Sequence, residues 1–337
     1  MVNELNVLPA GDESGSPLGN KDNSEYVKQL VQTLWQYRQE RFAGAGELFD
    51  RSRPTTLRPP VFRKNRADAN VIVKENAPRE VNAAVLGAIP ATSRHRWFAS
   101  MKSSQALAQS VFGNLASYGK AAALAGLPSE DGEAAFFENA SPSTSLGLEA
   151  AIHHLGEPSS TSVDVMIDGG ERVAVECKLT EWEVGSCSRP LTEDDDPRYC
   201  DGSYRIQNSR SERCQLTSIG VSYWRYVPML FNWDANVDHQ PCPLRFTFQL
   251  VRNVLAACIT PGGAVRPDAH AVMVYDARNP AFTEGGAGLR SWLDVRTGLK
   301  EPSRIRRASW QRVVARLAED PELDWLVSEL RRKYGFA

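Results

Sequence analysis

The chain has 337 residues, of which 42% are hydrophobic and 24% charged, and its formal net charge is −2. These values are typical of a soluble globular protein with a large core, and they exclude a protein coated in positive charge. No apolar run approaches the length that spans a bilayer, and the first residues lack the basic and apolar regions of a secretory signal. We therefore expect a cytoplasmic protein that has no membrane partner.

Four segments follow one another along the chain. We expect a disordered tail (1–22), a helical and loop-rich region (23–140), a core of helices and strands (141–280) and a C-terminal helical region (281–337). Within the core, residues 183–243 form a loop-rich insertion that contains four of the six cysteines.

Apolar residues at helical spacing predict several helices. The first runs from Ser24 to Phe42, and a second begins at Ser103, whose hydroxyl suits an N-cap. Ser103, Ser104 and Gln105 are also candidates to contact phosphate. Further elements are expected later in the chain: helices at 244–259, 303–318 and 321–333, and a buried strand at 271–277.

The stretch from Ser162 to Lys178, SVDVMIDGGERVAVECK, has the pattern of two antiparallel strands joined by a turn. Val and Ile are frequent in both runs, and the Asp-Gly-Gly sequence between them is typical of a hairpin. Side chains alternate along a strand, so Glu176 and Lys178 share one face while Val175 and Cys177 share the other.

The turn length decides which residues pair across this hairpin. A three-residue turn at 168–170 pairs Asp164 with Ala174, on the same face as Glu176 and diagonal to it. A two-residue turn would pair Asp164 with Val175 and place the charge in the core, so the hydrophobic pattern favours the first pairing. Two carboxylates and Lys178 then meet at one polar spot.

This combination suits the metal-assisted hydrolysis of a phosphodiester. Asp164, Glu176 and the backbone carbonyl of Cys177 offer the oxygen ligands that Mg²⁺ prefers, and Mn²⁺ could take the same place. The metal lowers the pKa of a bound water. Lys178 can orient or deprotonate that water, because the pKa of a partly buried lysine moves readily.

Asp164, then eleven residues, then Glu176-Cys177-Lys178 resembles the signature of the PD-(D/E)xK phosphodiesterase superfamily, the restriction-endonuclease-like nucleases. Val163 stands where the family motif has its proline. The resemblance covers roughly residues 143–276 and implies an α/β fold, a mixed central sheet flanked by helices, with helical additions at both ends of the chain. The segments SSQALAQSVFGNL, CDGSY, YWRY and FQLVRN are also similar to a bacterial group of proposed restriction endonucleases.

The resemblance implies two further site residues. Superfamily members typically carry a Glu on the helix before the hairpin, and Glu149, in a helix expected at 143–155, fits that place as a metal ligand. A Gln or Lys on the helix before the last core strand often assists at the site, which implies that Gln249 orients the water or the phosphate. The alternative is a Gln249 that caps a strand or faces solvent. Arg252, one turn further on, is a candidate DNA contact.

Arginines cluster at several places in the chain. Arg304 and Arg307, on the helix expected at 303–318, are candidate contacts to the DNA backbone, because a guanidinium group forks onto phosphate oxygens. The alternative is a solvated helix face. The net charge of −2 does not oppose DNA binding, since local basic patches matter more than the sum.

Four cysteines of the insertion form no Cys-x-x-Cys pair: Cys187, Cys200, Cys214 and Cys242. Free thiols in a reducing cytoplasm are the favoured interpretation. A zinc or iron–sulfur site is the open alternative, and it requires all four sulfurs to converge, whereas we expect at most some of them to cluster.

The sequence therefore predicts a Mg²⁺-dependent DNA endonuclease of bacterial restriction or a related defence. Two alternatives stay open: a DNA-binding module that keeps the nuclease-like fold without activity, and a nuclease of DNA repair or phage DNA processing with a cysteine-bound metal cluster. DNA is the expected partner. A homodimer and a DNA methyltransferase or other defence protein are further candidate partners.

Overall fold

The computed structural model describes residues 19–50, 57–158, 161–191, 199–207 and 210–336. The expected disordered tail therefore lies largely outside the described residues. The first helix, α1, spans Gly19–Arg41 and so takes in residues 19–22, which the composition had assigned to the tail. The described part of the chain contains no helix that is both long enough and apolar enough to cross a membrane.

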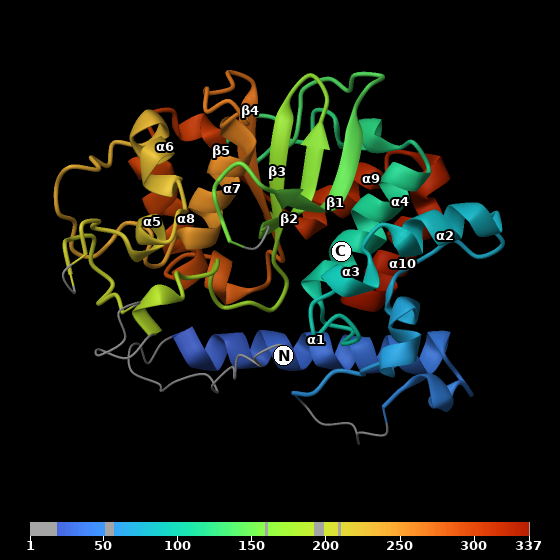
Figure 1. The fold of residues 1–337 in the computed structure, drawn as a ribbon. Coiled ribbons are helices and arrows are strands. Elements are labelled where there is room, and N and C mark those ends of the chain that lie inside the picture. Colours follow the sequence, from blue (N-terminus) through green and yellow to red (C-terminus); the bar gives the residue numbers. More distant parts are fainter. Residues whose placement is uncertain (1–18, 51–56, 159–160, 192–198, 208–209, 337) are drawn as a thin grey trace, which may run out of the picture.

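A mixed sheet forms the centre of the molecule (Figure 1). Its five strands lie side by side in chain order: β1 (Ser145–Ile152), β2 (Thr161–Asp168), β3 (Arg172–Cys177), β4 (Ala269–Tyr275) and β5 (Ile305–Ser309). The first three are antiparallel neighbours, and β4 and β5 continue parallel to β3. The predicted α/β class with a mixed central sheet is confirmed.

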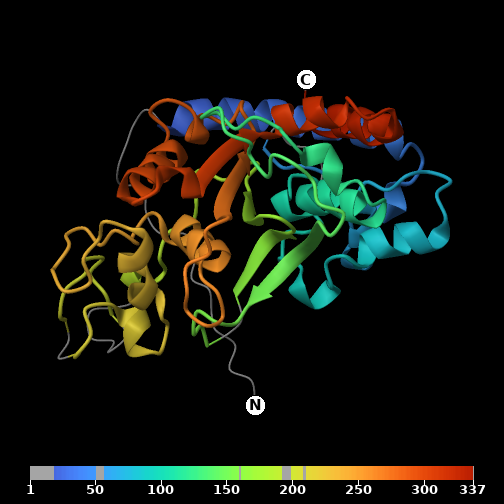
Figure 2. The ribbon, with the colours of Figure 1, turned by 90° about the horizontal axis from the view of Figure 1, so that it is seen from above.

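Helices cover both faces of the sheet. One face packs against α1, α3 (Ser104–Ala108), α4 (Asn114–Ser117), α9 (Trp310–Leu317) and α10 (Asp324–Tyr334). The other face packs against α6 (Tyr223–Leu230), α7 (Phe248–Cys258) and α8 (Ala287–Gly298). Two short helices complete the set, α2 (Arg79–Gly87) and α5 (Gln215–Ser218). The terminal helices α1 and α10 pack against each other across one side of the molecule (Figure 2).

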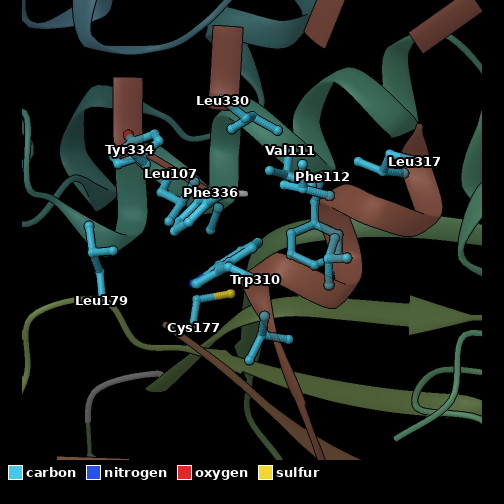
Figure 3. Packing of buried hydrophobic residues seen from close by; sticks show 14 of the residues in the cluster. Leu107, Val111, Phe112, Cys177, Leu179, Trp310, Leu317, Leu330, Tyr334 and Phe336 are labelled. Atoms are coloured by element: carbon cyan, nitrogen blue, oxygen red, sulfur yellow. The ribbon is translucent and has the colours of Figure 1, made fainter. Parts of the chain in front are cut away.

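The residues of β3 divide between the two faces of the sheet as the alternation predicts, whereas on β2 Val163 packs in the core opposite to that of Val165. Val175 and Cys177 belong to the core under α1, α3, α9 and α10, whereas Ala174 belongs to the core under α6 and α7. Figure 3 shows Cys177 beneath Trp310, among the apolar side chains of the first core. The indole Nε1 of Trp310 donates to the carbonyl oxygen of Lys178 at 3.0 Å, which fixes the end of β3 against that core.

Two predicted helices are wrong in whole or in part. The segment expected as a helix at 143–155 forms β1, because its Leu146 and Leu148, both partly buried against the core, alternate at strand spacing and pair with β2. The helix expected at 303–318 begins only at Trp310, after β5. Every residue of β4 is buried, so its outer edge needs a partner strand, and β5 satisfies that edge.

The other predicted elements are confirmed. The helix expected from Ser24 is the body of α1, and the one expected from Ser103 forms α3 and α4 with a single π turn between them. The predicted helices before and after the last core strands are α7 and α10, and the predicted buried strand is β4.

Candidate active site

The β2–β3 hairpin places two carboxylates opposite each other. Its ladder starts with Asp168 opposite Arg172, whose side chains form an ion pair, and continuing it along the strands brings Asp164 opposite Glu176. Asp164 was expected to pair with Ala174, so the register is shifted by two residues. A shift of two keeps every side chain on its face, and the predicted common face of Asp164 and Glu176 is therefore retained.

The side chain of Asp164 replaces a backbone acceptor where the β2–β3 ladder ends. Its Oδ2 accepts a hydrogen bond from the backbone N–H of Cys177 at 2.7 Å. Burial raises the pKa of the Asp164 carboxyl well above its ordinary value, and the nearby charge of Glu176 raises it further. Lys178 and the Cys177 N–H lower this pKa but do not compensate. The buried, metal-free site therefore disfavours the ionised form of Asp164.

Glu176 and Lys178 form a buried ion pair at the end of β3. Their side chains are 2% and 6% exposed, and Lys178 Nζ lies 2.9 Å from Glu176 Oε1. The same Nζ donates to Gln249 Oε1 at 2.9 Å, so the helix residue that the resemblance implied does reach the lysine. The other carboxylate oxygen, Glu176 Oε2, accepts from Asn253 Nδ2 at 2.6 Å.

Asn253 is a site residue that sequence reasoning missed. It lies one helical turn after Gln249 on α7, so both amides face β3. The signal was the spacing of four residues between two amides on one buried helix. Arg252, which was selected instead, donates from Nη2 to the carbonyl oxygen of Ser162 at 3.2 Å.

The charges around Lys178 determine its protonation. Burial lowers the pKa of its amine, but Glu176, Glu181 and Asp164 raise the pKa more, and the balance lies above the ordinary value for lysine. Lys178 is therefore a cation while these carboxylates are ionised. Neutralising the carboxylates would leave burial as the dominant effect and lower the pKa of Lys178.

Glu149 reaches the site from a strand, and the helix expected to carry it is absent from the described segment. Glu149 itself is unpaired in the β1–β2 register, between Leu148 and Ala150, which pair with Val165 and Val163, and its backbone has φ +47°, an unusual value for a residue other than glycine. Its carboxylate oxygens accept from Gln105 Nε2 and from Ser162 Oγ, each at 2.5 Å. Glu149 adds to the charges that raise the pKa of Asp164.

A second missed residue, Glu181, lies on the segment that follows β3. Its carboxylate accepts from Ser104 Oγ at 2.7 Å and from the backbone N–H of Leu179 at 2.6 Å. The start of α3 therefore contacts two acidic residues of the site, through Ser104 and Gln105, while Ser103 caps the helix as predicted by accepting from the Ala106 N–H. No local pattern marks Glu181, since only the packing of α3 brings it close.

Arg304 and Arg307 lie away from the predicted helix and bind within the protein. Arg304 is 6% exposed and pairs with Glu301 at 2.8 Å. Arg307, on β5, pairs with Glu130 at 2.6 Å and lies 4.9 Å from the ring centroid of Trp292. As contacts to DNA, both stay predictions.

No group of three or more His, Cys, Asp and Glu side chains is already arranged for a metal ion in the described parts of the chain. Asp164 and Glu176, as ladder neighbours, nevertheless offer the two carboxylates that a hard divalent cation needs when water fills its other positions. Burial and the charge of Glu176 raise the pKa of Asp164, and a bound cation would offset both by favouring the ionised carboxylate. The donor set therefore fits Mg²⁺.

Comparisons with known proteins bear on the whole of this architecture. A family model described as restriction endonuclease associating with ARP (REase-ARP) matches residues 36–335. The match contains the whole sheet and each of the site residues above. No match was found among curated proteins or among solved structures. The chain belongs to the REase-ARP family, a restriction-endonuclease family, and its mixed sheet and hairpin are the core of that fold.

Proposed function

We propose that this protein is a Mg²⁺-dependent endonuclease that hydrolyses phosphodiester bonds of DNA. The observation that carries the proposal is the Asp164, Glu176 and Lys178 set: two carboxylates on neighbouring strands, with Lys178 Nζ 2.9 Å from Glu176. Family membership supports a nuclease or defence role. The chemistry of the residues supports the finer assignment.

Asp164 and Glu176 would hold the cation, together with the backbone carbonyl of Cys177. Bound Mg²⁺ supplies an acidified water and a positive charge beside the phosphate. Glu149 lies next to this set, but Gln105 and Ser162 already bind both of its oxygens. Its contribution is therefore to the charge and orientation of the set.

The protein groups around Lys178 control where its amine points and when it loses its proton. Gln249 accepts from Nζ and fixes its direction, and Asn253 fixes the carboxylate of Glu176. The attacking water must lose a proton as its oxygen bonds to phosphorus and the phosphorus–oxygen bond to the sugar breaks. Lys178 accepts that proton once Glu176 and Asp164 no longer raise its pKa.

We infer that the activity serves restriction or a related defence, because the family is described as restriction endonucleases that associate with ARP. DNA is the proposed substrate, and a defence protein is the proposed partner. The homodimer and the methyltransferase partner stay predictions.

The test is plasmid cleavage by the purified protein with and without Mg²⁺ or Mn²⁺. Lys178→Ala removes the water-activating amine and should lower the cleavage rate by about 10²–10⁴-fold. Asp164→Asn keeps the shape of the side chain but loses a charge that the cation needs, and it should also abolish cleavage. Lys300→Ala, at an exposed lysine that donates to the Pro228 carbonyl oxygen, is the control and should cleave at the wild-type rate.

Wild-type rates in both site variants would refute the mechanism. A mobility-shift assay with the same DNA measures binding, and together with the cleavage assay it distinguishes a nuclease from a DNA-binding module without activity. The wild-type protein would instead be a binding module if it binds DNA but, with either metal, fails to cleave methylated, unmethylated and single-stranded substrates.

A further inference from the structure

The loop-rich insertion between β3 and α7 brings four thiols to one place. A cavity of about 20 Å³ is lined by Cys187, Cys200, Cys214 and Cys242. All four border this space, but no three of the described His, Cys, Asp or Glu side chains form a group that could hold a metal ion, so the expectation that at most some of the thiols converge stays a prediction. The other two cysteines, Cys177 and Cys258, lie in the cores on opposite faces of the sheet.

Backbone amides point at three of these sulfurs in a repeated way. Burial raises the pKa of the Cys187 thiol to about 11, and the backbone N–H of Arg189, two residues on, acts in the opposite direction. Burial likewise raises the pKa of Cys214 and of Cys242, and in each case the N–H two residues on opposes it. Amides in this position stabilise a thiolate, which is the form that binds metal.

We propose that Cys187, Cys200, Cys214 and Cys242 bind one Zn²⁺ ion as a tetrahedral four-thiolate site. On binding, four S–H groups release their protons to solvent and four Zn–S bonds form, each of about 2.3 Å. Because no three of the described acidic, His or Cys side chains are already set around a centre, the thiols turn inward as the ion binds. Arg189 and Arg245 also line the cavity and balance the negative charge of the centre.

The size of the cavity favours a single ion. A space of about 20 Å³ holds roughly one water-sized particle. An iron–sulfur cluster needs room for several metal and sulfide atoms within the same ring of cysteines. The thiols therefore surround a volume suited to one zinc ion.

Apolar residues of α6 pack in the core on that face of the sheet, but the segments that carry the cysteines are mostly loops. The helices within its described part are short: α5 has 4 residues and α6 has 8. Distant segments meet at the cysteines through single backbone contacts, from Cys187 N to the Arg245 oxygen at 2.9 Å and from Cys242 N to the Gly202 oxygen at 2.8 Å. A zinc ion would join these segments, since the free energy of binding a structural metal adds to that of folding.

The proposed zinc site also supports the helix that carries Gln249. Gly185, two residues before Cys187, accepts the backbone N–H of Gln249 at 3.2 Å. At the other end of the insertion, Cys242 lies shortly before the start of α7 at Phe248. The site thus anchors both chain segments that lead to the start of α7.

The experiment measures zinc in protein purified without a histidine tag. Mass spectrometry of the metal content should give one zinc per chain, and the Cys214→Ser/Cys242→Ser double variant should lose it. Cys258→Ser is the matched control, since Cys258 is buried outside the insertion and donates to the Ala269 oxygen. Asp164→Asn should keep its zinc, which separates this site from the proposed catalytic one.

A measurement on the wild type covers the case in which the double variant fails to fold. A thiol-blocking mercurial should react with four thiols together and release the zinc, which a metal indicator detects. Cys177 and Cys258 should stay unreactive until the chain unfolds. Replacement by Co²⁺ should give the absorption of tetrahedral cobalt with thiolate ligands. The proposal would be overturned by any of three results: wild-type protein without zinc after growth in zinc-containing medium, a folded double variant that keeps its full zinc content, or purified protein that contains iron and sulfide.

Discussion

The two polar clusters of this protein, the hairpin site and the cysteine-lined insertion, are held in different ways. The hairpin site is built on strands, so the ladder between β2 and β3 sets Asp164 opposite Glu176 before any ligand arrives. The cysteines lie on loops and at the end of a short helix, and each is brought to the cavity by tertiary contacts. A metal at the first cluster would serve chemistry, whereas a metal at the second would serve the fold.

The charges of the two clusters agree with this division. The hairpin site holds several buried or partly buried carboxylates beside one buried lysine, and burial, followed by the charge of Glu176, raises the pKa of Asp164. Burial also raises the pKa of Cys187, Cys214 and Cys242, but a thiol is neutral at ordinary pH. A cation at the hairpin site would therefore favour the ionised form of Asp164, whereas a cation in the insertion would have to displace protons from neutral thiols.

The largest effect is expected from placing a carboxylate on the buried face of β3, at the residue before Glu176. Val175→Asp should unfold the protein, because Val175 is fully buried and an unpaired carboxylate there costs several kcal/mol. That is comparable to the stability of a typical domain, about 5–15 kcal/mol. Far-ultraviolet circular dichroism during thermal unfolding checks this prediction.

Glu176→Gln is the matched control for this change, since it alters the next residue on the opposite face. It should fold and lose cleavage, because the amide keeps the shape of the side chain but not its charge. A folded Val175→Asp protein with a normal melting transition would contradict the assignment of faces on β3.

The sequence predicted the hairpin site better than its surroundings, and the reason is the range of the interactions. Alternation along a strand is a local property, so the common face of Asp164, Glu176 and Lys178 could be read from a few residues. The register could not, because a two-residue slip leaves the hydrophobic pattern unchanged. The ion pair of Asp168 with Arg172 marks the observed register.

The surroundings depend on contacts between distant segments. The apolar spacing near Glu149 suits a helix as well as a strand, and pairing with β2 decided for the strand. Glu181 meets α3 across 77 residues of chain, as its bond with Ser104 shows. The four cysteines likewise reach one cavity from segments that are distant in sequence, which their spacing along the chain does not predict.

The contact between the two regions offers the next test. Gly185 has φ +108°, and a Cβ atom there would overlap the side chain of Gln249. Gly185→Ala should therefore displace Gln249 from Lys178 and lower the cleavage rate by about 10–100-fold, the usual effect of losing a group that orients a site residue. Backbone strain should add about 1–3 kcal/mol of destabilisation.

Gly220→Ala separates these two effects. Gly220 has φ +95° in the same insertion, but no atom lies within 4 Å of the position of its Cβ. It should show a similar loss of stability with cleavage near the wild-type rate. Equal losses of cleavage in the two variants would show that strain, and not the contact with Gln249, is responsible.

A smaller effect is expected from Asp164→Asn on the stability of the metal-free protein. A carboxyl group whose pKa is raised by folding stabilises the fold while protonated, and this contribution is lost as pH rises from its ordinary pKa through its raised one. The amide does not titrate, so the variant should exceed the wild type by about 1 kcal/mol above that range, a usual size for one substitution. The difference should vanish at low pH.

Denaturant unfolding at a series of pH values measures this difference. Asp168→Asn, at the exposed end of the same strand, controls for the substitution itself. Mg²⁺ should stabilise the wild type and leave Asp164→Asn unchanged. A gain in stability that is equal at all pH values would show that charge crowding at Asp164 is not its cause.

The smallest effect is expected at Trp182, where the hairpin site meets the insertion. Its side chain is 62% exposed and follows Glu181, whose carbonyl oxygen accepts from Asn279 Nδ2 at 2.9 Å and so fixes the backbone beside the site. An exposed indole on a fixed backbone can stack on an unpaired base, an interaction of about 1–3 kcal/mol for each base. Trp182→Ala should weaken binding of single-stranded DNA by roughly fivefold, the low end of that range.

Fluorescence anisotropy in the Lys178→Ala background, where the DNA stays intact, measures the affinity. Trp182→Phe should keep most of it, and Leu293→Ala, an exposed apolar residue on α8, should keep all of it. Equal affinities for Trp182→Ala and the wild type would confine DNA recognition to groups other than this indole.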